Sequence, residues 1–390
     1  MIPYGRQEIT DADIKEVEKV LRSDFLTQGP TVPRFEQSVS KYCNANYAVA
    51  VNSATSALHI ACLALDLGPG DWLWTSPNTF VASANCGRYC GADIDFVDID
   101  PKTYNMSVSA LSKKLIQAKK TGKLPKIVVP VHFAGQPCDM SAINDLSKNY
   151  GFKIIEDASH AIGASYKNTK VGSCTHSDVT IFSFHPVKII TTGEGGMALT
   201  NDKKLSESIR RFSAHGITRD KLLMSPRSTD EIWNYQQIQL GFNYRMNDIQ
   251  AAIGISQMKR LDHYISRRHE IAKYYDLKFS NLPIITPYQL PETYSSYHLY
   301  PICIEDDKNA KLQQKIYYEL HDNGIAVNLH YIPAHRQPYY ESFGFKEGDF
   351  LESEKFHRKV ISLPIFPSLK KRECDKVISV ISKVFQDSVS

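Results

Sequence analysis

The chain has 390 residues, of which 42% are hydrophobic and 23% charged, and its formal net charge is +4. These values are typical of a globular protein long enough for two domains. The charges are dispersed and contain no basic block that would favour a nucleic-acid partner. No apolar run reaches membrane-spanning length, and the first residues lack the apolar core of a signal peptide. We therefore expect a cytoplasmic protein with neither nucleic acid nor a membrane as partner.

Strand-like and helix-like segments alternate through the first two hundred residues. The stretch Thr10–Asp13 matches a helix capping box with Asp in place of Glu or Gln, and an amphipathic pattern follows it. Strands are predicted at 47–51, 72–75, 94–97, 127–131, 153–156, 179–183 and 197–200. Helices are predicted at 53–65, 79–90, 107–119 and 140–150. This alternation predicts an α/β protein with a mainly parallel, seven-stranded sheet and helices on both faces.

The pattern changes in the last third of the chain. The segment 218–236 is polar without a clear period and is interpreted as a mobile loop, and a long helix is predicted from Asn247. Further on, a strand at 297–304 and helices at 310–323 and 373–385 indicate a smaller α/β unit. We expect a large domain at 1–250, with an N-terminal arm and helix. A connecting helix and a small C-terminal domain should occupy 251–390.

Eight cysteines are scattered at positions 43, 62, 86, 90, 138, 174, 303 and 374. Only Cys86 and Cys90 lie close together, at the i,i+4 spacing of a helix, and no second pair matches them as a zinc site would require. We expect buried free thiols in a reducing compartment and no metal site.

Three polar residues lie at the ends of predicted strands and carry the main chemical signal. Asp157 follows one strand, and Ser183 ends the next, with Lys188 shortly beyond it and the glycine-rich stretch 191–196 after that. Ligands of such sheets bind beyond the carboxyl ends of the strands. Pyridoxal phosphate (PLP) requires a lysine amine for its aldehyde and a carboxylate for its ring nitrogen, with hydroxyl and backbone N–H groups for its phosphate. The spacing therefore predicts a PLP site.

Each of these residues also has a purely structural interpretation. A lone lysine is usually a solvated surface residue, and an aspartate after a strand most often caps the next helix. The strand and the glycines around Lys188 favour a buried, nucleophilic amine instead. His160 could support Asp157 or simply pack.

Two further segments are weaker signals. Asn52–Ser56 is either an ordinary helix cap formed by Ser53 or a phosphate seat at a helix N-terminus, built from the N–H groups of Ala54 and Thr55. Phe80 is either part of the core or an aromatic face for the cofactor.

Together these motifs resemble those of the DegT/DnrJ/EryC1/StrS sugar aminotransferases, and the resemblance runs over nearly the whole chain. The segments that carry it are Asn52–Ala57, Glu156–Gly163, Ser183–Lys188, Gly193–Gly196 and Gly241–Met246. The resemblance implies the fold of the fold-type-I PLP-dependent transferases, which have a large domain and a smaller C-terminal α/β domain.

The family's residue roles can be carried over position by position. By this resemblance, Lys188 is the Schiff-base lysine and Asp157 the partner of the ring nitrogen. The cofactor would also be bound by Ala54, Thr55, Phe80, His160, Ser183 and Asn243. Asn243 would reach the site of a neighbouring subunit, which implies a homodimer with shared active sites.

The implied substrate pocket overlaps with the cofactor site at Ala54, Ser183 and Asn243. Its remaining residues would be Tyr4, Asp24, Phe25, Leu26, Thr27, Asn328, Leu329, His330 and Tyr331. The roles of His185 and Glu194 stay open. A branch of the family that has histidine in place of the lysine dehydrates sugars, and Lys188 argues against that branch.

Finer features resemble one branch of the family, which acts in the pseudaminic acid pathway that serves flagellin glycosylation. They are Ser23–Pro30, Asp71–Pro77 and Tyr104–Met106. This resemblance implies that L-glutamate donates an amino group to C4 of a UDP-linked 4-keto-6-deoxy-N-acetylhexosamine of the L-altrosamine type. The alternatives are another nucleotide-sugar C3 or C4 aminotransferase of the family and a non-enzymatic PLP- or sugar-binding regulatory protein. A nicotinamide dehydrogenase is disfavoured because no G-x-G-x-x-G follows the first strand.

Overall fold

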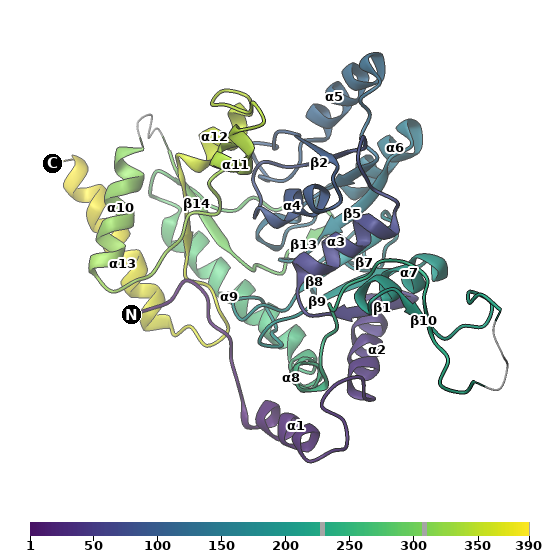
Figure 1. The fold of residues 1–390 in the computed structure, drawn as a ribbon. Helices are drawn as coiled ribbons and strands as arrows, with labels where there is room; N and C mark the ends of the chain where they lie inside the picture. Colours follow the sequence, from purple (N-terminus) through teal and green to yellow (C-terminus); the bar gives the residue numbers. More distant parts are fainter. Residues whose placement is uncertain (227–230, 306–309, 390) are drawn as a thin grey trace.

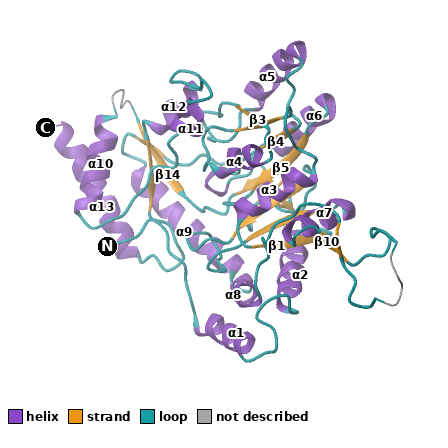
Figure 2. Ribbon diagram, viewed as in Figure 1, coloured by secondary structure: helices purple, strands orange, loops and turns teal. Residues whose placement is uncertain are grey.

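The computed structural model describes residues 1–226, 231–305 and 310–389. A seven-stranded sheet has the spatial order β1-β9-β8-β5-β4-β2-β3 (Figures 1 and 2). β9 is antiparallel to both of its neighbours, and the other pairs in this sheet are parallel. The mainly parallel seven-stranded sheet is therefore confirmed. Its strands are β1 (Tyr47–Val51), β2 (Trp72–Thr75), β3 (Asp93–Phe96), β4 (Ile127–Val129), β5 (Lys153–Asp157), β8 (Val179–Ser183) and β9 (Gly196–Thr200).

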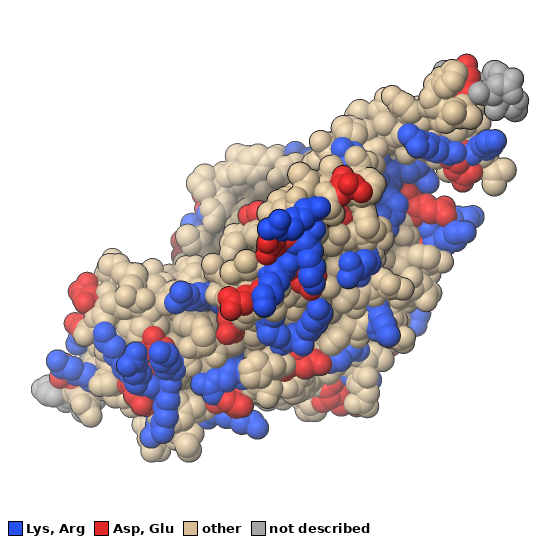
Figure 3. All heavy atoms as spheres, turned by 90° about the horizontal axis from the view of Figure 1, so that it is seen from below, with Lys and Arg blue, Asp and Glu red and all other residues tan. Residues whose placement is uncertain are grey.

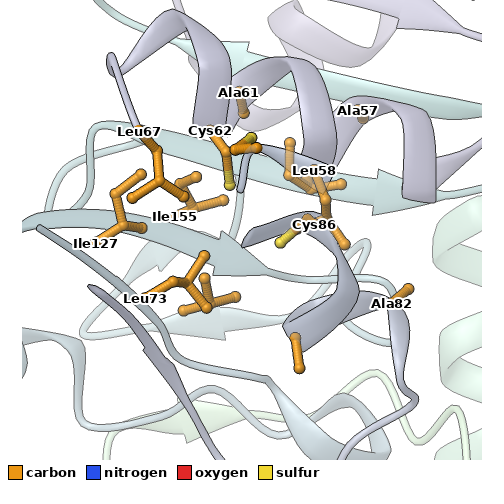
Figure 4. Close-up of a cluster of buried hydrophobic side chains, with 14 of the residues drawn as sticks. Ala57, Leu58, Ala61, Cys62, Leu67, Leu73, Ala82, Cys86, Ile127 and Ile155 are labelled. Atoms are coloured by element: carbon orange, nitrogen blue, oxygen red, sulfur yellow. The ribbon is translucent and has the colours of Figure 1, made fainter. Parts of the chain in front are cut away.

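Helices cover both faces of this sheet, because successive side chains of a strand point to opposite sides. On one face, α3, α4 and α7 pack against an apolar cluster that includes Leu58, Leu73 and Ile155, drawn in Figure 4. On the other face, α2, α5 and α6 cover the alternate strand residues, such as Trp74 and Phe182. These helices are α2 (Thr31–Cys43), α3 (Ala54–Ala64), α4 (Ala82–Tyr89), α5 (Val108–Thr121), α6 (Met140–Tyr150) and α7 (Lys203–Ser213).

A second apolar core surrounds a three-stranded antiparallel sheet of the order β12-β14-β15. Ile2 belongs to this core, and its N–H donates to the Gly324 carbonyl at 2.8 Å. The domain division at residue 250 stays a prediction. Ile2, from the first part of the chain, packs in a core whose other residues come from the second part. The elements of the second core are β12 (Ile284–Ile285), β14 (Tyr300–Ile304), β15 (Val360–Leu363), α9 (Leu261–Phe279), α10 (Lys311–Asp322) and α13 (Lys371–Val389).

Some boundaries differ from the sequence predictions. The long helix predicted from Asn247 is in fact two helices, α8 (Asp248–Met258) and α9. The sequence did not show the break, because the apolar periodicity continues across the two residues that separate them. The helix α2 was not predicted from the sequence; its Pro33 lies in the first turn, where proline is tolerated. The loop predicted at 218–236 is flanked by the paired strands β10 and β11, and its residues 227–230 lie outside the described part.

Short elements complete the fold. β13 pairs with β6, which joins the second half of the chain to the first. The short strands are β6 (Ser165–Tyr166), β7 (Thr169–Lys170), β10 (Ile217–Thr218), β11 (Gln236–Gln237) and β13 (Thr293–Tyr294). The short helices are η1 (Phe133–Gly135), η2 (Ala334–Arg336), α11 (Pro338–Glu341) and α12 (Leu351–His357).

The first helix, α1 (Asp11–Leu21), packs against α8 and is fastened at its N-terminus. The predicted capping box is present, since the Thr10 N–H donates to Asp13 Oδ2 at 2.8 Å. The same carboxylate is buried and accepts two hydrogen bonds from Arg260 Nη2, at 2.7 and 2.8 Å, and one from Gln257 at 3.1 Å. One aspartate thus both begins α1 and holds it against the body of the protein.

Charged side chains of both signs lie side by side on the molecular face shown in Figure 3. All eight cysteines are buried and free, as predicted. Within the described ranges, no helix is long and apolar enough to cross a membrane. Over the same ranges, His, Cys, Asp and Glu side chains form no group of three or more that could ligate a metal ion.

Candidate active site

A cavity of about 950 Å³ opens at the carboxyl ends of β1, β5 and β8. Sheets of this kind bind their ligands at that edge. The second core completes the wall through His298 and residues 328–332. The cavity brings together most of the predicted site residues, namely Tyr4, Ala54, Thr55, Phe80, Asp157, His160, Ser183, Lys188, Asn328, Leu329, His330 and Tyr331.

Other predicted residues lie outside the cavity lining. Asp24, Phe25, Leu26 and Thr27 form an exposed segment before α2, and Asn243 is exposed on the loop before α8. The fold of this chain therefore does not bring them together with the other predicted site residues. His185 and Glu194, whose roles were left open, both line the cavity, with 4.0 Å between His185 Nε2 and Glu194 Oε1.

Lys188 lies in the loop that follows β8, on the wall of the cavity. Its N–H donates to the His185 carbonyl at 2.9 Å, and the loop returns to the end of β8 through the Thr192 N–H, 3.0 Å from the Phe184 carbonyl. The lysine side chain is half-buried because one side of it faces the open cavity. Burial lowers the pKa of the Lys188 amine to about 8, against the opposing effect of the Asp157 carboxylate. The neutral form of this amine is therefore far more populated near neutral pH than that of an exposed lysine.

The Asp157 carboxylate ends β5 and is buried beside the cavity. Its Oδ1 accepts from Ser159 Oγ at 2.6 Å and from the Ser159 N–H at 3.1 Å. Its Oδ2 accepts from Ser83 Oγ at 2.6 Å. These donors fix the orientation of the carboxylate.

His160 packs near Asp157 and bonds elsewhere. Its Nε2 lies 3.1 Å from the Tyr331 hydroxyl, and its ring lies 4.4 Å from that of His298, centre to centre. Burial, together with the charges of Lys188 and His330, holds the pKa of His160 well below its usual range. His160 is therefore a neutral imidazole, and the support of Asp157 comes from the two serines.

The N-terminus of α3 forms a third side of the cavity. The Ser53 hydroxyl accepts from the Ser56 N–H at 3.1 Å, so the cap engages the third helical amide and leaves those of Ala54 and Thr55 for a ligand. A Cβ at Gly196 would lie 2.4 Å from the Ala54 nitrogen, so only glycine allows β9 to approach the helix so closely. Such a terminus favours a phosphate group.

These groups fit PLP. Lys188 offers an amine of lowered pKa, Asp157 a carboxylate, and α3 an anion seat, all around one cavity. Asn52 Oδ1 is also buried at the cavity without a hydrogen-bond partner among the described residues, as expected for a group that waits for a ligand.

Several residues at this site were not predicted from the sequence. Ser159 lies two positions after Asp157, a spacing that often forms a local side-chain-to-backbone bond, and could have been found. Ser83, Thr79 and His298 carry no local signal, since they reach the site only through the fold.

The fold and this set of groups define a fold-type-I PLP-dependent enzyme. The profile of one aminotransferase family matches residues 7–382. The chain belongs to this family, the DegT/DnrJ/EryC1/StrS aminotransferases, and is a PLP-dependent aminotransferase.

Three similar proteins illustrate the match. The spore coat polysaccharide biosynthesis protein SpsC of Bacillus subtilis is 38% identical, over 98% of this chain and 97% of its own. The UDP-4-amino-4,6-dideoxy-N-acetyl-beta-L-altrosamine transaminase of Campylobacter jejuni is 35% identical, over 98% of both chains. Among solved structures, Helicobacter pylori PseC, an aminotransferase of pseudaminic acid biosynthesis, superposes with a TM-score of 0.90 at 30% identity, over 99% of both chains.

Proposed function

We propose that this protein transfers an amino group from L-glutamate to C4 of a UDP-4-keto-6-deoxy-N-acetylhexosamine of the L-altrosamine type. The observation that carries this proposal is the end-to-end similarity to the Campylobacter jejuni transaminase, which is matched by the fold of PseC. The cavity, at about 950 Å³, lies at the upper end of the range for small-molecule sites and has room for a cofactor and a sugar together.

Cofactor binding would use the three sides of the cavity. Lys188 would hold the aldehyde through its amine, and the hydroxyl of Ser183 with the amides of Ala54 and Thr55 would hold the phosphate. Phe80, of which 60% is exposed, presents an uncovered aromatic surface at the cavity wall. We assign this surface to the cofactor ring, with His160 packed nearby.

Proton movement would depend on Lys188 and Asp157. When bound, PLP supplies an electron-withdrawing ring that stabilises negative charge at the carbon that loses a proton. Lys188, with a pKa of about 8, is basic enough to accept the proton from the amino donor and acidic enough to return one. The buried Asp157 carboxylate would accept a hydrogen bond from the protonated ring nitrogen.

The sugar would be bound on the side of the cavity formed by the second core. Tyr4 and residues 328–331 line that wall, and the Tyr4 and His330 rings lie 5.5 Å apart. His330 Nδ1 lies 2.9 Å from Ser362 Oγ, which anchors this segment to β15. The wall therefore offers aromatic surfaces and polar groups of the kind that bind a sugar.

We also propose a homodimer with shared active sites. Asn243 and the segment 24–27 are exposed and lie outside this chain's own cavity. The hairpin formed by β10, β11 and the described residues between them carries large exposed apolar side chains, with Ile232 94% and Trp233 71% exposed. Such surfaces are costly in water and favour an interface. A second subunit would cover them and receive Asn243 at its phosphate site.

A second candidate is another nucleotide-sugar aminotransferase of the same family that acts on a different keto-sugar. The similarity to SpsC, at 38% identity against 35% for the altrosamine transaminase, favours keeping it. Substrate tests separate the two candidates.

Absorption spectroscopy of the purified protein tests the proposal. A yellow band that L-glutamate bleaches and a UDP-4-keto-6-deoxy-N-acetylhexosamine of the L-altrosamine type restores would establish both half-reactions. Bleaching without recovery would keep the aminotransferase and reject this sugar in favour of the second candidate. The Lys188→Ala variant should show no turnover with either substrate, and steady-state turnover in it would contradict the role of the lysine.

A further inference from the structure

Asp157 is held by donors from two distant parts of the chain. Ser159 is a local neighbour, but Ser83 lies 74 residues away, in the first turn of α4. Ser83 is fully buried and does not line the cavity, so it can influence a ligand only through the side chains that it bonds, among them Asp157.

A second hydroxyl stands behind Ser83. Thr79 Oγ1 lies 2.7 Å from Ser83 Oγ, and Thr79 is also buried, at the cavity wall. An ionised carboxylate can only accept, so Ser83 must donate its single hydroxyl proton to Asp157. Thr79 must then donate to Ser83. The direction of this chain of hydrogen bonds is set by the carboxylate.

The two carboxylate oxygens are therefore not equivalent. Oδ1 accepts two bonds from Ser159, whereas Oδ2 accepts one, from Ser83. Oδ2 thus keeps more free acceptor capacity for a further donor in the cavity.

We propose that Ser83, polarised by Thr79, is a positioning residue that aims Oδ2 of Asp157 at the ring nitrogen of the cofactor and keeps the shared proton on that nitrogen. A hydrogen bond to the ionised carboxylate favours its charged form, and a fixed negative charge beside the ring nitrogen favours a proton on that nitrogen. The inference rests on the role of Asp157 in the proposed function and deepens it.

The test uses holoenzyme loaded with PLP that carries ¹⁵N in the ring, and NMR then reports whether the nitrogen is protonated. In Ser83→Ala the ¹⁵N signal should move toward the unprotonated position. The turnover number should fall roughly tenfold, because a hydrogen bond to a charged group is lost. KM for glutamate should stay unchanged, since Ser83 does not touch the cavity. A ¹⁵N signal and turnover number equal to those of the unaltered protein would overturn the proposal.

Two further variants complete the design. Thr79→Val keeps the side-chain shape and removes only the second hydroxyl, so its ¹⁵N signal should move the same way by a smaller amount. If Ser83→Ala does not fold, an unmoved signal in Thr79→Val overturns the proposal. Ser213→Ala removes a buried hydroxyl that donates to the Arg210 carbonyl, and should leave the signal in place.

Failure of the underlying assignment would look different. Asp157→Asn should shift the ¹⁵N signal whether or not Ser83 has the proposed positioning role. A fully protonated ring nitrogen in Asp157→Asn would overturn the proposed role of Asp157 itself.

Discussion

At the scale of single residues, the Lys188 amine sets the pH at which the protein can take up its cofactor. Its pKa of about 8 lies well below that of an exposed lysine because the side chain is withdrawn from water. Only the neutral amine attacks an aldehyde. The rate of PLP attachment to the apoprotein should therefore rise about tenfold per pH unit below pH 8 and level off above it. Stopped-flow absorbance measures this rate, with a free lysine derivative as control, and a rate that still climbs steeply above pH 9 would contradict the lowered pKa.

Asp157 separates cofactor binding from chemistry. Asp157→Asn keeps the size of the side chain but removes its charge, so PLP should still bind while the ring nitrogen loses its partner. We expect a loss of about a hundredfold or more in the rate of the glutamate half-reaction. Single-turnover absorbance gives the rate, and the PLP content of the variant serves as control. Normal turnover in this variant would mean that the ring nitrogen is held by another group.

At the scale of elements, the contact between β9 and α3 depends on a missing side chain. Gly196→Ala would place a Cβ 2.4 Å from both the Ala54 nitrogen and the Ser53 carbonyl carbon, which must push the helix N-terminus out of position. The affinity for PLP should fall tenfold or more, in line with the usual cost of overpacking. Equilibrium titration with PLP measures this loss. Gly68→Ala adds a methyl group to open space and should bind PLP normally.

The attachment of α1 is a second contact between elements that can be tested. Burial raises the pKa of Asp13, but the bonds from Arg260 and Thr10 outweigh it and leave the pKa lowered. The lowered pKa stabilises the docked helix above about pH 4, and this stabilisation is lost as the pH falls through the folded-state value. Asp13→Asn should cost about 2 kcal/mol of docking free energy at neutral pH.

Hydrogen exchange over residues 11–21 detects this undocking. Asp11→Asn, an exposed acid of the same helical turn, is the matched control and should leave the exchange unchanged. Equal protection of α1 in Asp13→Asn and Asp11→Asn would show that the Arg260 contact contributes little.

At the scale of the whole molecule, the exposed hairpin predicts the oligomeric state. Replacing both Ile232 and Trp233 by Asp should convert a dimer into monomers and lower activity, because Asn243 would no longer reach a second cavity. Light scattering coupled to size exclusion gives the mass. Leu277→Asp alters an apolar side chain that is 69% exposed on α9, away from the hairpin, and should stay dimeric. A monomeric unaltered protein would contradict the shared-site proposal.

Much of the fold could be predicted because the central strands are buried on both faces and read as apolar runs. β1, β2 and β8 have the predicted boundaries, and the residues at strand ends meet at one edge of the sheet as parallel topology requires. The break between α8 and α9 could not be predicted, because the helical spacing of apolar residues continues across the two residues between them. Ser83 could not be predicted, since its contact with Asp157 spans 74 residues and exists only in the folded chain.

Because Ile2 docks beside Ile325, the order in which the segments are synthesised differs from the order in which they reach their folded positions. The Ile2 carbonyl accepts from the Ala326 N–H at 2.7 Å, so Ile2 is synthesised well before its partners and finds them only after most of the residues between have been made. Tyr4, two residues on, lines the cavity. The arm is thus made before its partners and is among the last segments to dock. An affinity tag fused ahead of Met1 would interfere with the docking of this arm, whereas a tag placed after α13 would not (Figure 1).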